Sequence, residues 1–123
     1  MRNIFLAGLG GALGSMARYG LGLLALAWAG TSFPLGTLGV NVLGCFLMGA
    51  LLVLGWDGHN ALRVFLATGF LGGFTTFSAF GGETLSLILA GAGFRACLNI
   101  GANLILGLAA TALGYFLSRA ITG

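Results

Sequence analysis

The sequence predicts an all-α membrane protein with four transmembrane helices in a single domain. Of its 123 residues, 59% are hydrophobic and only 6% are charged. Soluble domains carry about 25% charged residues, which cover their water-facing surface. Because one membrane span needs about 20 apolar residues, this length accommodates four spans with short turns. The domain therefore covers residues 1–123 and leaves no room for a soluble domain.

The limits of the four spans follow from the turn-forming residues. The only proline, Pro34, follows Thr31 and Ser32 and marks the first turn. Residues 56–60 are the most polar stretch and form a loop, and a glycine-rich turn surrounds residue 92. The spans are therefore expected at about residues 3–29, 35–55, 62–90 and 95–120.

The arginines are almost evenly divided between the two sides of the predicted membrane. Arg2, Arg63 and Arg119 fall on one side, whereas Arg18 and Arg95 lie towards the other. Insertion follows an excess of lysine and arginine in short loops on one side, and here there is almost none. Two alternatives stay open: one weakly preferred orientation, or both orientations, which would allow an antiparallel dimer. Four helices enclose little interior, so oligomerisation is expected.

Composition excludes two function classes. The arginines are scattered and no lysine is present, so the chain offers no basic patch for nucleic acid. The only histidine, His59, lies in a loop with Asp57 as its one acidic neighbour. No set of nucleophile, base and acid can be assembled from such residues, and the chain is not expected to be an enzyme.

Three asparagines and a group of hydroxyls interrupt the apolar spans. Asn41 lies in the middle of the second span, and Asn99 and Asn103 share one face of the fourth because they are four residues apart. The hydroxyls of the third span belong to Thr75, Thr76 and Ser78. Polar groups at membrane depth either join helices or line a path. Their number in so apolar a chain favours a path.

The third span also contains its own helix-breaking residues. Gly72 and Gly73 precede Thr75 and Thr76, and both residue types lower helix propensity. A broken membrane helix exposes carbonyl groups that can bind a cation. The alternative is a simple glycine kink.

Two phenylalanines and one acid follow the expected break. Phe77 and Phe80 are three residues apart, so both rings lie on one side. The positive edge of a phenyl ring can contact an anion, and conduction requires binding weak enough to release the ion. Glu83 is the only acid within a span, and its burial is costly unless it is paired or protonated. Its partner could be Arg18 or a hydroxyl.

Three motifs follow one another along the first three spans. They read Gly10-Gly11-xx-Gly14-xxx-Arg18-Tyr19, Pro34-xx-Thr37-xxx-Asn41-xx-Gly44 and Gly69-Phe-Leu-Gly-Gly-Phe-Thr-Thr-Phe-Ser-Ala-Phe-xx-Glu83. In order and spacing they resemble the Fluc (CrcB) family of fluoride channels. The third motif is highly specific, and the first two are moderately so.

The resemblance implies an antiparallel dual-topology homodimer in the inner or plasma membrane, with two pores that export cytoplasmic fluoride passively. It also implies a structural sodium ion at the interface, bound by backbone carbonyls at Gly72 and Thr75. The residues implied for the fluoride pathway are Asn41, Phe77, Ser78, Phe80, Asn99 and Asn103. Arg18 falls at the family's vestibule arginine, while Thr76 and Glu83 are possible structural polar residues.

One position departs from the family pattern, and other functions stay open. Ala79 stands where the family commonly has a threonine, which removes one hydroxyl from the polar track. A small multidrug-type proton-coupled transporter would need a carboxylate in the first span, and residues 3–29 contain none. A non-transporting membrane subunit would use every polar residue for packing. A heterodimer with a related chain is a further alternative to the homodimer.

Overall fold

The computed structural model describes residues 1–123 as four long helical segments without a strand. The first two segments are single helices, α1 (Arg2–Ala29) and α2 (Leu35–Leu52). The third comprises α3 (Ala61–Arg63), the π-helix η1 (Val64–Leu71), α4 (Gly72–Phe74) and α5 (Phe77–Leu89). The fourth comprises α6 (Gly93–Gly101), the π-helix η2 (Ala102–Leu106) and α7 (Gly107–Thr122).

Three of these segments have the length and apolar composition to cross a membrane. They are Leu35–Leu52, Ala61–Leu89 and Gly93–Thr122. The 28 residues of α1 exceed the about 20 residues that a span needs. However, α1 contains Arg18 and several glycines, and it is less apolar than the other three. A span in α1 therefore stays a prediction.

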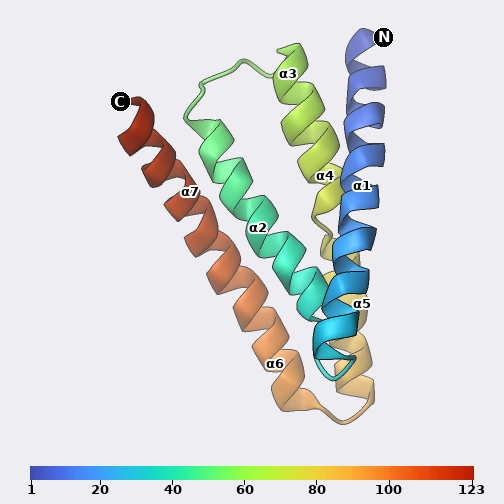
Figure 1. Cartoon of the computed structure of the whole chain (residues 1–123). Helices are drawn as coiled ribbons and strands as arrows, with labels where there is room; N and C mark the ends of the chain where they lie inside the picture. Colours follow the sequence, from blue (N-terminus) through green and yellow to red (C-terminus); the bar gives the residue numbers. More distant parts are fainter.

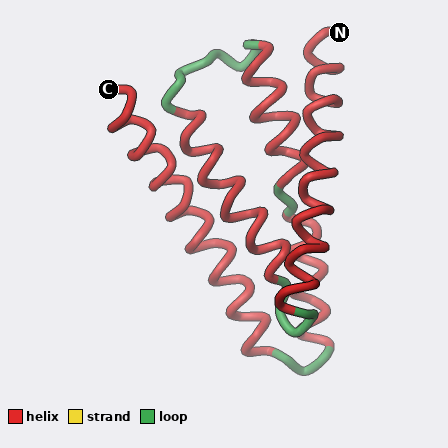
Figure 2. The backbone as a smooth tube through the Cα atoms, viewed as in Figure 1, coloured by secondary structure: helices red, strands yellow, loops and turns green.

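The segments run alternately up and down, so that both termini and the loop before α3 lie at one end (Figure 1). The other two connections lie at the opposite end (Figure 2). Gly30 and Gly91 follow α1 and α5 with φ angles of 70° and 75°, a region that glycine enters without steric cost. Gly55, at 59°, lies in the turn after α2, which ends at Leu52 rather than at about residue 55.

Glycines let α1 approach the third segment closely. Gly10 and Gly14 are buried, and a methyl group on Gly14 would overlap the backbone carbonyl of Phe70. From the opposite side, a methyl group on Gly73 would overlap the carbonyl of Gly11. Small residues at this spacing allow such backbone contact between membrane helices. The glycine motifs of these two segments are thus used within the chain.

Glycines also allow close contact between α2 and α7, which lie side by side along most of their length (Figure 1). Gly49 of α2 faces the backbone of Thr111, and Gly114 of α7 faces the backbone of Phe46. A methyl group on either glycine would overlap the facing carbonyl oxygen. The separation of these two helices is therefore set by their backbones.

Replacing Gly114 with alanine is expected to destabilise the protein by about 1–3 kcal/mol, the usual cost of overpacking. The methyl group must push α7 away from the Phe46 carbonyl. Thermal unfolding in detergent would measure the change. Gly8→Ala is the matched control, because Gly8 has nothing within 4 Å of the added methyl group. Equal unfolding temperatures for the Gly114→Ala variant and the native protein would contradict the close approach.

Few residues are buried within the single chain. Only 14 of 123 residues are buried, and the apolar core consists of Val40, Val64, Leu71, Phe74 and Ala96. Large apolar side chains are instead exposed along every segment. In a protein of this hydrophobicity, such surface is suited to lipid or to a second subunit.

Candidate functional site

The site is centred on two extended residues within the third helical segment. Thr75 has φ −86° and ψ 157°, and Thr76 has φ −151° and ψ 115°, so neither residue is helical. The Thr76 side chain then caps α5 by accepting a hydrogen bond from the Ala79 N–H at 3.1 Å. Two glycines and then, after Phe74, two β-branched residues lower helix propensity here and favour this local geometry.

The extended residues release two backbone carbonyls. In a continuous α-helix, the Gly72 carbonyl would accept from the Thr76 N–H, and the Thr75 carbonyl from the Ala79 N–H. Here the Thr76 N–H donates to Asn41 Oδ1 at 2.8 Å, and the Ala79 N–H donates to Thr76 Oγ1. Both carbonyls have thus lost their α-helical donors.

These two carbonyls fit the expected sodium ion. Carbonyls freed from a broken helix coordinate Na⁺ in membrane proteins, and Gly72 is exposed while Thr75 is half-buried. The chain contains no cluster of three or more His, Cys, Asp or Glu side chains that could hold a metal ion. Backbone oxygens at the interruption are among the ligands that the chain offers.

Arg18 of α1 binds the same segment. Its Nε donates to the Gly73 carbonyl at 3.0 Å, so a third carbonyl of the interrupted segment is satisfied from α1. Arg18 also lines a cavity of about 360 Å³, together with Thr37, Thr76 and Glu83. This cavity is where the structure places the expected vestibule arginine.

Asn41 of α2 holds the interruption from the other side. Its Oδ1 accepts from the Thr76 N–H, and its Nδ2 donates to the Thr76 carbonyl at 3.2 Å. The same Nδ2 donates to Asn103 Oδ1 at 3.0 Å. One side chain thus satisfies both backbone groups of Thr76 and links α2 to η2.

The hydrogen bonds continue from Asn103 through the chain interior. Asn103 Nδ2 donates to the Asn99 carbonyl at 2.9 Å and to Asn99 Oδ1 at 3.0 Å. Asn99 Nδ2 donates to Thr84 Oγ1 at 2.9 Å, and Thr84 Oγ1 donates to the Phe80 carbonyl at 2.7 Å. We call the four side chains that carry these bonds, Asn41, Asn103, Asn99 and Thr84, the polar network.

Thr84 is the member of the polar network that sequence analysis missed. A threonine within a helix ordinarily donates to the carbonyl four residues before it, so nothing in its local sequence marks it as special. It is 8% exposed, and Asn99 is completely buried. The contact between them depends on how α5 packs on α6, which no local signal reveals.

The expected pathway residues gather around one pocket of about 220 Å³. Its lining includes Asn41, Thr76, Phe77, Phe80 and Asn103. The two phenyl rings lie 5.4 Å apart between centroids and are tilted by 51°.

Two other expected pathway residues lie outside this pocket. Ser78 is exposed beside it, with its Oγ 3.3 Å from Thr76 Oγ1. Asn99 is enclosed behind Asn103 and does not line the pocket. The structure thus brings together most of the expected pathway residues, while the ion-binding role of each stays a prediction.

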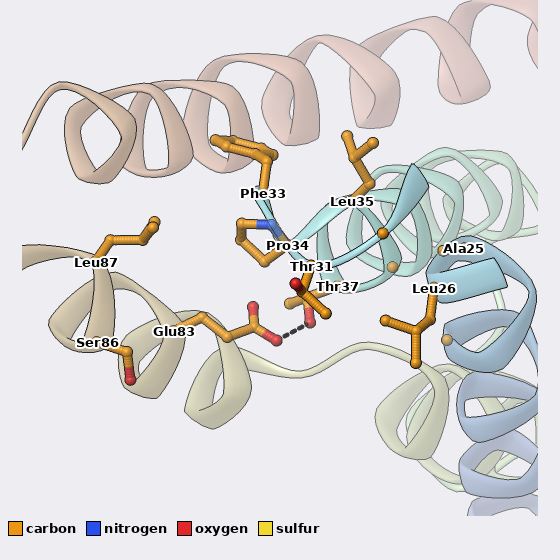
Figure 3. Close-up of a pocket in the computed structure, with 13 residues that line it drawn as sticks. Ala25, Leu26, Thr31, Phe33, Pro34, Leu35, Thr37, Glu83, Ser86 and Leu87 are labelled. Carbon is orange, nitrogen blue, oxygen red and sulfur yellow. Dashed lines mark hydrogen bonds between the residues drawn. The ribbon is translucent and has the colours of Figure 1, made fainter. Parts of the chain in front are cut away.

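Glu83 also lines an adjoining pocket of about 440 Å³ between the end of α1, the turn before α2, and α5 (Figure 3). Its Oε1 accepts a hydrogen bond from the Thr37 hydroxyl at 2.7 Å, and its buried Oε2 has no partner. Of the two partners considered from the sequence, the structure selects the hydroxyl, while Arg18 binds Gly73 instead.

The chain is similar to proteins of one family over nearly its whole length. Residues 5–115 match the family described as CrcB-like protein, Camphor Resistance (CrcB). A Thermus thermophilus protein named Fluoride-specific ion channel FluC is 48% identical, over 100% of both chains. The same name is given to a Dehalococcoides mccartyi protein that is 48% identical, over 95% of this chain and 92% of the relative.

A third relative gives the same result. A Rhizobium etli protein, also named Fluoride-specific ion channel FluC, is 44% identical over 98% of this chain and 99% of its own. Ion channels cross membranes, and three helices here are apolar and long enough to do so. The chain is a multi-pass membrane protein. Identity at this level over the full length establishes kinship, and the chain therefore belongs to the CrcB family.

Proposed function

We propose that the chain forms a passive channel that carries fluoride out of the cytoplasm down its electrochemical gradient. The observation that carries the proposal is the pocket beside the interrupted third segment, where Phe77 and Phe80 lie next to Asn41 and Asn103. The full-length relatives named as fluoride-specific channels support the choice of ion.

The pocket chemistry suits a small anion that must pass through. No cationic side chain lines the pocket, so an anion would not be trapped by a buried arginine. Phe77 and Ser78 are the first two residues of α5, and N–H groups at these positions have no partner within their own helix. Helix N-termini attract anions through such free N–H groups. The phenyl edges add weakly positive contacts.

The functional unit that we propose is an antiparallel homodimer in the inner or plasma membrane, with α1 as its fourth span and two fluoride pathways. The near-even distribution of arginines supports insertion in both orientations. Phe77 is 80% exposed in the single chain, so one side of the pocket is open to the surroundings. A second copy would complete the wall and cover part of the exposed apolar surface.

The sodium ion is proposed to lie between the two subunits, bound by the carbonyls of Gly72 and Thr75. Both carbonyls have lost their α-helical donors, and Gly72 is exposed. When bound, the cation would neutralise the partial negative charge of these oxygens and hold the interrupted segments together.

Thr75→Ala is expected to leave sodium affinity within about twofold of the native value, because a carbonyl ligand survives loss of its side chain. The Thr75 hydroxyl already donates to the Leu71 carbonyl at 2.9 Å. Asn41→Leu should weaken sodium binding, because the released Thr76 N–H can return to the Gly72 carbonyl. Sodium-dependent thermal stability of the purified protein would measure both. Loss of binding in Thr75→Ala alone would contradict carbonyl ligation.

Fluoride efflux from vesicles that contain only this purified protein tests the function itself. A fluoride electrode would record release after a potassium ionophore removes the opposing potential, with chloride efflux as the control. Fluoride release without chloride release is the expected result. If folded protein releases no fluoride, the self-sufficient homodimer is wrong, and co-reconstitution with a related chain would then test the heterodimer.

A further inference from the structure

We infer that Thr84 and Asn99 are positioning residues for the fluoride pathway, which act through Phe80 and Asn103 without contacting the ion. The inference rests on the proposed channel function. Asn99 is completely buried and Thr84 is 8% exposed, and neither lines the pocket. Both belong to the polar network, whose two ends are attached to the segment that carries the phenyl rings.

The polar network has a single direction, set by the backbone groups at its ends. It begins at the Thr76 N–H, which can only donate, and ends at the Phe80 carbonyl, which can only accept. Because Asn41 accepts from Thr76 through Oδ1, its Nδ2 must point towards Asn103. Asn103 and Asn99 follow the same order: each accepts through Oδ1 from the residue before it and donates through Nδ2 to the residue after it.

Thr84 completes this sequence because a hydroxyl can accept and donate at once. Its oxygen accepts from Asn99 Nδ2 at 2.9 Å and donates to the Phe80 carbonyl at 2.7 Å. The ring of hydrogen bonds therefore closes across residues 76–80. Without the Thr84 hydroxyl, Asn99 Nδ2 loses this acceptor, and the Asn99 side chain that accepts from Asn103 is no longer held by α5.

The orientation of these amides affects the pocket directly. Asn41 and Asn103 both line it. The Asn103 Nδ2 group donates to Asn99, and the Asn103 oxygen accepts from Asn41 Nδ2, so the polar network fixes where these two amides lie in the pocket wall. The same bonds hold the Phe80 backbone to α6, which keeps the Phe80 ring beside Phe77. Thr84 thus helps to position one amide of the pocket wall and one phenyl ring.

Three variants separate the hydroxyl from the packing of Thr84. Thr84→Val keeps the shape and removes the hydroxyl, whereas Thr84→Ser keeps the hydroxyl and removes a methyl group. Thr111→Val is the matched control, because the Thr111 hydroxyl donates only to the Gly107 carbonyl at 3.0 Å and belongs to no network. The readouts are fluoride efflux per folded protein and hydrogen–deuterium exchange of peptides that cover residues 76–80.

We expect Thr84→Val to lower fluoride efflux about tenfold, as the loss of about one hydrogen bond in the conducting state implies. Exchange at residues 76–80 should be faster in this variant, while Thr84→Ser and Thr111→Val resemble the native protein in both readouts. Equal efflux and exchange in Thr84→Val and the native protein would overturn the inference. Equal losses in Thr84→Val and Thr84→Ser would also overturn it, because packing would then explain them.

Two further outcomes are distinguishable. If Thr84→Val does not fold, Thr84→Ala provides a second variant without the hydroxyl, and the same two comparisons with Thr84→Ser decide. If the native protein conducts no fluoride, the proposed function fails, but the exchange of residues 76–80 still shows whether Thr84 holds this segment. Normal exchange in the hydroxyl-free variants would then reject the positioning role separately.

Discussion

Asn41→Leu is expected to reduce fluoride efflux at least about a hundredfold, which corresponds to roughly 2.7 kcal/mol in the barrier for conduction. The leucine removes the bonds of Asn41 to the Thr76 N–H, the Thr76 carbonyl and Asn103. Backbone groups left unpaired in an apolar surrounding cost about 1–3 kcal/mol each. The two extended residues would then rearrange, and the pocket wall would lose the amide that holds Asn103.

Asn41→Asp distinguishes the backbone role of Asn41 from its role towards the anion. Aspartate can still accept from the Thr76 N–H, but it replaces the Nδ2 donor with a second oxygen and adds negative charge. We expect it to unfold at a higher temperature than Asn41→Leu while conducting no better. Efflux from both variants and unfolding in detergent would be measured side by side. Native efflux in either variant would exclude Asn41 from the pathway.

Phe80→Ile is expected to lower fluoride efflux at least about tenfold while the protein remains folded. Isoleucine is apolar and fills part of the same space, but it has no ring edge with positive charge. The Phe80 ring lines the pocket and lies 5.4 Å from that of Phe77. Vesicle efflux and thermal unfolding would be recorded together, so that lost conduction can be told from lost structure.

Phe94→Ile is the matched control, because the Phe94 side chain is 76% exposed and lies outside the pocket. We expect this variant to conduct as the native protein does. Phe77→Ile should resemble Phe80→Ile, since both rings line the same pocket. If Phe80→Ile and Phe94→Ile conduct equally well, the ring edge of Phe80 has no role in passing the anion.

Many residues of the site could be predicted from the sequence, because polar residues are conspicuous within apolar spans. Asn41 and Asn103 were expected on a pathway and line one pocket with Phe77 and Phe80. The spacing of three residues placed both rings on one side, since helical geometry is local. The segment from Gly72 to Thr76 was singled out by its poor helix propensity, and it is where the extended residues occur.

Other parts of the site could not be predicted, because they depend on residues far apart in the chain. Glu83 had two possible partners, and packing of α2 on α5 brought the Thr37 hydroxyl, 46 residues away, to its carboxylate. Arg18 was placed instead against the Gly73 carbonyl. No local pattern distinguishes these pairings, since each residue has the same neighbours in sequence whichever partner it takes.

The sequence by itself determined the helical class, the four segments and the residues that hydrocarbon rejects, because hydrophobicity and helix propensity act over short stretches of chain. Only the tertiary structure decided how those residues share their hydrogen bonds. It joined Asn41 to Asn103 across 62 residues and enclosed Asn99 against Thr84. Few water molecules reach such groups, so each donor must find an acceptor within the protein. Which acceptor it finds is settled by the packing of the helices.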